Sequence, residues 1–258
     1  MGLRPFAFAQ DRLCFTPRND ILGQLVEKLL ESQRGRFSRK LGIDIESKDS
    51  KEIFKWFLSS TLFGARITET IAVNTYHEFE SNKVIDPSKI VGVGWDGLVK
   101  ILDTGGYVRY DFKTATKLLN VCETLLSDYK GDLNELHKSS VNYADLKNRL
   151  EGLGKGIGDV TVNIFLRELR GIWELAEPLP QNFVILGARN LGLTKPTGKN
   201  KSEREKMLYE LKAIWKDARV RNYTFSDFEV SLLKLAKNFC NKKKCKLCAM
   251  QKYCQKFR

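Results

Sequence analysis

Residues 146–166 read LKNRLEGLGKGIGDVTVNIFL, and this stretch decides the fold. Leu146 and Leu150 are four positions apart, which places them on one face of a helix. Glycine then occupies every second position from Gly152 to Gly158, which ends that helix. Apolar residues resume at helical spacing after Asp159. The stretch therefore predicts two helices joined by a tight, glycine-rich turn.

This turn has the chemistry of a phosphate-binding site. Gly156 and Gly158 flank Ile157, and glycine allows a positive φ and a close approach of the backbone to a ligand. The turn amides and the start of the second helix would donate to a phosphate, while Ile157 packs between the helices. Such a helix-hairpin-helix binds DNA without reading base sequence, and Lys155 would add a positive charge. An ordinary tight turn between antiparallel helices is the alternative.

The rest of the chain also has a helical pattern. Apolar residues recur at helical spacing, for example at Ile53, Phe57 and Leu58, and sustained strand alternation is absent. Glycine and proline interrupt the pattern often enough to predict about nine or ten helices. No repeat of about 20–50 residues is visible, which argues against a solenoid. We expect an all-α fold, and 42% hydrophobic residues are enough to fill its core.

Composition favours a polyanionic partner. The chain has 44 Lys and Arg against 31 Asp and Glu, a formal net charge of +13. Nucleic acid is the first candidate for that partner, and a merely soluble basic surface is the alternative. No window approaches the roughly 18 apolar residues of a membrane span, and residues 1–16 lack a secretory signal pattern. We expect a cytoplasmic monomer that associates with the nucleoid when bound to DNA.

The cysteines are concentrated at the C-terminus. Four of them fall within fifteen positions, whereas Cys14 and Cys122 stand alone. Such clustering in a cytoplasmic chain favours metal ligation over disulfides. Four thiolates suit either a tetrahedral zinc ion or an iron-sulfur cluster. The predicted ligands are Cys240, Cys245, Cys248 and Cys254, and the intervening Lys242, Lys243 and Lys244 are predicted to contact phosphates.

The order of these features resembles the endonuclease III-like helix-hairpin-helix DNA glycosylases from about Phe54 to Cys254. Leu58–Ala65 looks like the family's early helix and DNA-probing turn, and Thr104–Tyr107 looks like the turn carrying its wedge residue. The family's cysteine spacing is Cys-x6-Cys-x2-Cys-x5-Cys, whereas this chain has x4, x2 and x5. The resemblance implies a [4Fe-4S] cluster, with zinc as the alternative.

The chain departs from the family at the catalytic positions. With Gly156-Ile157-Gly158 as the hairpin core, Val160 stands where bifunctional members have a lysine nucleophile. The other register, Gly152-Leu153-Gly154, would place a glycine there and interrupt the second helix. The loop that carries the family's aspartate has none here, and Glu177 is its nearest candidate carboxylate. Gly106 falls at the wedge position, so Tyr107 or Tyr110 would have to stack on DNA.

These features predict two helical lobes with DNA in the cleft between them. Residues 51–166 would form one lobe, residues 18–50 and 167–258 the other, and residues 1–17 an N-terminal extension. The predicted function is recognition of damaged or mispaired bases in double-stranded DNA, with monofunctional N-glycosylase activity if the protein is an enzyme. A non-catalytic DNA-binding or damage-sensing protein of the same fold is the main alternative. A zinc-stabilised nucleic-acid adaptor unrelated to repair is a third.

Overall fold

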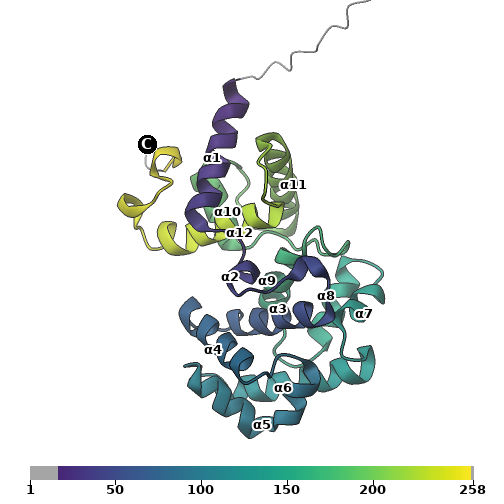
Figure 1. The fold of residues 1–258 in the computed structure, drawn as a ribbon. Helices are drawn as coiled ribbons and strands as arrows, with labels where there is room; N and C mark the ends of the chain where they lie inside the picture. The colour runs from purple at the N-terminus through teal and green to yellow at the C-terminus, as the bar shows by residue number, and fades with distance from the viewer. Residues whose placement is uncertain (1–16, 257–258) are drawn as a thin grey trace, which may run out of the picture.

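The computed structural model describes residues 17–256 as a chain of helices (Figure 1). Two of them, α2 and α7, are shorter than seven residues, which is why the sequence pattern predicts fewer. The α-helices are α1 (Pro17–Gln33), α2 (Phe37–Lys40), α3 (Ser50–Phe63), α4 (Glu69–Ser81), α5 (Pro87–Thr104), α6 (Asp111–Tyr129), α7 (Leu133–Lys138), α8 (Tyr143–Gly152), α9 (Asp159–Leu169), α10 (Asn182–Asn190), α11 (Lys201–Ala218) and α12 (Phe225–Leu235).

Side-chain caps fix where several helices begin. Asp49 accepts hydrogen bonds from the first amides of α3, and Asn142 accepts one from Asp145 at the start of α8. At α12, Thr224 and Asp227 form a reciprocal capping box. Each cap satisfies amides that have no partner inside the helix. Local sequence therefore sets these boundaries without help from distant packing.

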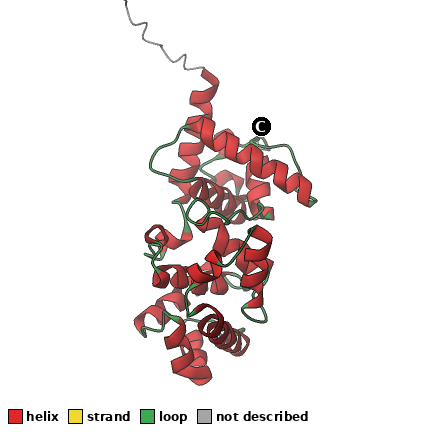
Figure 2. Ribbon diagram, turned by 90° about the vertical axis from the view of Figure 1, so that its right-hand side faces the viewer, coloured by secondary structure: helices red, strands yellow, loops and turns green. Residues whose placement is uncertain are grey.

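The helices form two groups that meet at α9. Figure 1 shows α1, α10, α11 and α12 at one end of the molecule and α3–α8 at the other. Helix α9 contacts α3 and α8 in one group and α12 in the other. Figure 2 shows the same elongated arrangement after a quarter turn. Helix α9 and the segment that leaves it thus lie where the two groups meet.

Each group has a dense core. In the group that contains α3–α8, Phe57 of α3 packs edge-on against Phe165 of α9 with ring centroids 5.2 Å apart. The indole of Trp56 donates to the Phe165 carbonyl at 3.0 Å. In the other group, α10 lies so close to α12 that a Cβ at Gly187 would collide with the Leu232 carbonyl oxygen. Interiors packed this closely hold the walls of the cleft in place.

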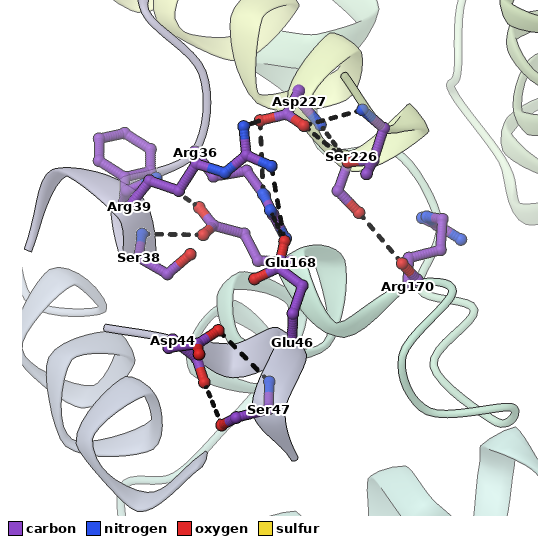
Figure 3. A network of polar contacts seen from close by, with 12 residues as sticks. Arg36, Ser38, Arg39, Asp44, Glu46, Ser47, Glu168, Arg170, Ser226 and Asp227 are labelled. Atoms are coloured by element: carbon purple, nitrogen blue, oxygen red, sulfur yellow. Dashed lines mark hydrogen bonds and ion pairs between the residues drawn. The ribbon is translucent and has the colours of Figure 1, made fainter. Parts of the chain in front are cut away.

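A buried ionic network joins the two groups (Figure 3). Glu168 at the end of α9 accepts hydrogen bonds from the amides of Phe37 and Ser38, at 2.8 and 2.9 Å. Burial raises the pKa of Glu168, while these two amides favour its charged form. The guanidinium of Arg36 lies 3.4 Å from the carboxylate of Asp227 in α12. The network therefore ties α2, α9 and α12 together at the junction.

The prediction of an all-α fold is confirmed. Residues 17–256 contain no strand, only an isolated bridge between Arg170 and Trp173. Among these residues no helix is both long and apolar enough to cross a membrane. Cys14 and all but the last residue of the predicted N-terminal extension lie outside the described residues. The predicted lobe boundaries stay a prediction.

Candidate functional site

The glycine-rich turn lies between α8 and α9, as the sequence predicts. Ile157 is buried beneath the turn, whereas Lys155 and Gly158 are exposed. Gly156 has a φ of +95°, a conformation that residues with a side chain rarely adopt. Ile157 donates its amide to the carbonyl of Gly154 at 3.1 Å, which closes the turn. Apart from the Lys155 side chain, the exposed side of the turn is therefore backbone.

Several amides of this turn have no acceptor within residues 17–256. They belong to Gly156, Gly158 and the first residues of α9, which starts without a side-chain cap. Asp159, the first residue of α9, forms an ion pair with Lys147 of α8 at 2.7 Å. Its negative charge at the turn is thus balanced from within the protein. The arrangement offers hydrogen-bond donors to an anion at the start of α9.

A cleft of about 1120 Å³ opens beside this turn. It lies between α8 and α9 on one side and α11 on the other, with residues 177–183 crossing its floor. Val160, at the predicted lysine position, is 53% exposed on the cleft wall. Side chains lining the cleft include Tyr143, Lys147, Asn163, Phe183, Lys201 and Arg204.

Glu177 lies at the rim of the cleft with two cationic partners. One of its carboxylate oxygens, Oε2, is 3.0 Å from Nη1 of Arg170 and 2.6 Å from Nζ of Lys212. The side chain is 42% exposed, and it also borders a second cavity of about 450 Å³. The other oxygen, Oε1, has no partner within the described residues. Glu177 can therefore present a negative charge to the cleft through one oxygen.

The segment that follows Glu177 is held by side chains rather than by secondary structure. Pro178 and Pro180 have no amide hydrogen, so the segment cannot join a helix in the usual way. Three consecutive carbonyls are instead bound by side chains from α9, from its C-cap residue Arg170 and from α11. Pro178 O accepts from Arg170 at 2.7 Å, Leu179 O accepts from Asn163 at 2.8 Å, and Pro180 O accepts from Arg204 at 2.7 Å.

The four C-terminal cysteines border one cavity of about 430 Å³. None of the four forms a disulfide, and each is half-buried. Burial raises the pKa of Cys240 and Cys248, and the neighbouring thiols raise it further. Within residues 17–256, no group of three or more His, Cys, Asp or Glu side chains is arranged so that it could hold a metal ion. The cavity has soft donors on its wall and room for a cluster of several atoms.

A widened turn delivers the first of these cysteines. After α12 the chain forms a π-helical turn, Ala236–Cys240, in which Asn241 donates its amide to the Ala236 carbonyl at 2.8 Å. Short π-helical turns are frequent at functional sites. Cys240 lines the cavity together with the other three despite the short first interval of four residues.

The three lysines between the first two cysteines are exposed, and their contact with phosphates stays a prediction. Lys243 has a φ of 53° and also lines the cysteine cavity. In Figure 1 this loop, in yellow, lies on the opposite side of the molecule from α8 and α11. The lysines and the hairpin are thus separate surfaces rather than one patch.

The expected role of Tyr107 is corrected by the structure. Its side chain is 1% exposed, and its hydroxyl donates to the Leu62 carbonyl of α3 at 3.1 Å. It is a core residue that links α3 to the turn after α5, and it cannot stack on DNA from there. Tyr110 is half-buried beneath Arg109, whose guanidinium lies 5.5 Å from the ring centroid. The stretch Leu58–Leu62, expected to precede a DNA-probing turn, is buried along α3.

Sequence reasoning missed the side chains that position the cleft segment. Asn163 and Arg170 are both buried, and Arg204 comes from a helix 34 positions after Arg170. The only signal was the charged run Arg167–Arg170 at the end of an apolar helix. Charges in such a run usually face solvent, but here they face the junction.

Comparison with known proteins adds no relative to this picture. No protein-family model matches the chain, and no curated protein matches it significantly. Its functional assignment therefore depends on the chemistry of the hairpin, the cleft and the cysteine cavity.

Proposed function

We propose that this protein binds double-stranded DNA through the turn between α8 and α9 and belongs to the endonuclease III-like superfamily. One observation carries the proposal: unsatisfied amides at the start of α9 lie at the mouth of a large cleft. Free amides at a helix start bind phosphate oxygens, and such contacts position a duplex without reading its sequence. The net charge of +13 favours the same partner.

The cleft supports a base-excision role. Enzymes that act on a base must take it out of the stack, and a cleft of about 1120 Å³ can enclose a nucleotide. Glu177 would stabilise positive charge that develops on the sugar as the bond to the base breaks, or would orient water. Val160 supplies no amine, so the activity we propose is monofunctional: hydrolysis of the N-glycosidic bond that leaves an abasic site.

A second function, DNA binding without catalysis, is favoured by the contacts of Glu177. A carboxylate bound to both Arg170 and Lys212 has less negative charge to offer a sugar cation than a free one. With this second function, the protein binds damaged or mispaired DNA and does not itself cleave the N-glycosidic bond. The two functions share the hairpin contact and differ only in what happens inside the cleft.

We further propose that the four cysteines hold a [4Fe-4S] cluster, with zinc as the alternative. The support is their shared cavity and their soft donor chemistry. Bound there, the cluster would act as a structural crosslink for the C-terminal loop. Iron, sulfide and zinc analysis of the purified protein separates the two alternatives, and it also tests the reading as a zinc-stabilised adaptor.

The proposed function is tested with a panel of short duplexes, each carrying one lesion or mismatch. Binding is measured by fluorescence anisotropy, and base release is measured by strand cleavage after alkali. A glycosylase cleaves at least one member of the panel only after alkali treatment. A sensor binds such a member more tightly than undamaged duplex and cleaves none. Absence of any duplex binding at low salt contradicts both functions.

A further inference from the structure

Lys117 of α6 lies against the glycine-rich turn, although it is 38 positions away from Lys155 in the sequence. A Cβ placed on Gly156 would be 2.9 Å from Cε of Lys117 and 3.5 Å from its Nζ. One helical turn further along α6, Val121 touches Gly154 in the same way, with its Cγ2 2.7 Å from the position of a Cβ. The turn therefore sits on α6, and the ammonium group of Lys117 lies at its edge.

This ammonium group lacks a counter-ion among the residues that the structure describes. Within residues 17–256, Lys117 makes no ion pair and no side-chain hydrogen bond. The acid that follows the turn, Asp159, is engaged by Lys147 at 2.7 Å. Burial lowers the pKa of Lys117, since no acid offsets the loss of water around its charge. A half-buried cation without a partner is costly, and an arriving anion would stabilise it.

Two complementary groups thus meet at one place. Within the described chain, the amides of Gly156 and Gly158 have no acceptor, and the Lys117 cation beside Gly156 has no anion. Lys155, also on the turn, is exposed and adds a second positive charge. An ammonium group and backbone amides together form charge-assisted hydrogen bonds to a phosphate, which are about twice as strong as neutral ones.

We propose that Lys117 contacts the same DNA phosphate as the turn amides and that α6 is part of the DNA-binding surface. The proposal rests on the proposed function, because it assigns a residue to that function's hairpin contact. It extends the contact from residues neighbouring in sequence to a helix that the sequence pattern does not associate with DNA. The ligand group is a phosphodiester oxygen, so the contribution of Lys117 is independent of base sequence.

The proposal is tested with Lys117→Met, which keeps the apolar stem over the turn and removes the charge. Binding to an undamaged duplex is followed from 50 to 200 mM salt. We expect affinity to fall about threefold to tenfold at 50 mM and the salt slope to decrease by about 0.9, the value for one phosphate contact. Lys117→Arg should retain most of the affinity. Lys28→Met, an exposed lysine of α1 that lies 3.8 Å from Glu31, is the control and should change neither quantity.

A second measurement needs no variant. The wild-type protein is treated with an amine-acylating reagent with and without duplex, and modification of each lysine is read by mass spectrometry. Lys117 should be protected by DNA while Lys28 is not. Unchanged slope in Lys117→Met together with unchanged acylation of Lys117 overturns this inference but leaves the proposed function standing. Failure of the wild-type protein to bind duplex overturns both.

Discussion

The ammonium nitrogen of Lys212 lies 2.6 Å from Oε2 of Glu177, so α11 is ionically bound to the segment that follows α9. Arg170 reaches the same oxygen from the other side of the junction at 3.0 Å. The only carboxylate proposed to act on a substrate is therefore also a contact between the two groups of helices. Because Arg170 and Lys212 contact the same carboxylate that would act on the substrate, a change that removes its charge affects both roles.

Glu177→Gln keeps the shape of the side chain and removes its charge. If the protein is a glycosylase, we expect base release to fall at least about tenfold, since loss of a positioned carboxylate typically costs about 10²- to 10⁴-fold. Duplex affinity should change little, because the turn amides are untouched. Single-turnover assays with alkali development measure the rate. An enzyme as active as wild type after this change would show that Glu177 is only a junction residue.

No covalent complex should form through position 160. Trapping with borohydride requires an amine within reach of the sugar, and Val160 has none. We therefore expect abasic duplex incubated with the protein and borohydride to give no shifted band on a denaturing gel. Efficient trapping that is lost in Lys155→Ala would instead place the hairpin in the other register.

Tyr107→Phe should destabilise the fold without affecting DNA. The Leu62 carbonyl loses one donor and keeps the amide of Ala65 at 3.3 Å, so the change costs about 0.5–1.5 kcal/mol of unfolding free energy. Urea denaturation measures the change. Tyr110→Phe is the control, because the Tyr110 hydroxyl makes no hydrogen bond within residues 17–256 and its loss should be nearly neutral. A large drop in duplex affinity for Tyr107→Phe, at unchanged stability, would restore Tyr107 as a DNA contact.

Cys248→Ser should abolish the visible absorption and the iron content of the purified protein. It should also reduce solubility and stability, since a structural cluster contributes to folding. Cys122→Ala, a change at a buried cysteine of α6, should retain iron. A colourless wild-type protein with one zinc per chain would show that the four cysteines hold zinc instead of a cluster.

Replacing Lys242, Lys243 and Lys244 together by alanine tests whether the exposed loop contacts DNA. We expect weaker binding to every duplex and a salt slope reduced by about one to three units. The measurement is the same salt titration as for Lys117→Met. An unchanged slope would mean that the duplex, held by the hairpin on the other side of the molecule, does not reach this loop.

Stability should fall at acid pH through Glu46. Burial alone would raise the pKa of Glu46, but its ion pair with Arg36 lowers it below the ordinary value of 4.5. An acid with a lowered pKa in the folded state stabilises the protein above its unfolded pKa, and that contribution is lost as pH falls through the folded value. The midpoint temperature of thermal unfolding should therefore decrease as the pH is lowered below about 4.5. The drop should be smaller in Glu46→Gln, and an equal drop would assign it to other carboxylates.

The sequence predicts the parts of this molecule that depend on neighbouring residues. Glycine at alternate positions and leucines four apart define α8 and the turn before α9, and both are local signals. Tyr107 was misplaced because the family resemblance put Gly106 at the wedge position and left the next aromatic residue to stack on DNA, while the burial of Tyr107 depends on α3, 45 positions away. Arg170 and Asn163 were missed because each binds a main-chain carbonyl, and a carbonyl leaves no pattern in a sequence.

Those carbonyls have a consequence for how this protein diverges. The segment Pro178–Pro180 is held through main-chain atoms, which every amino acid possesses. Substitutions in this segment therefore leave the three hydrogen bonds possible, whereas substitutions of Asn163, Arg170 or Arg204 remove one. A search for relatives with this architecture should require an asparagine five positions after the last hairpin glycine and an arginine seven positions beyond it. These two side chains make the contacts, whereas the segment contributes only main-chain atoms.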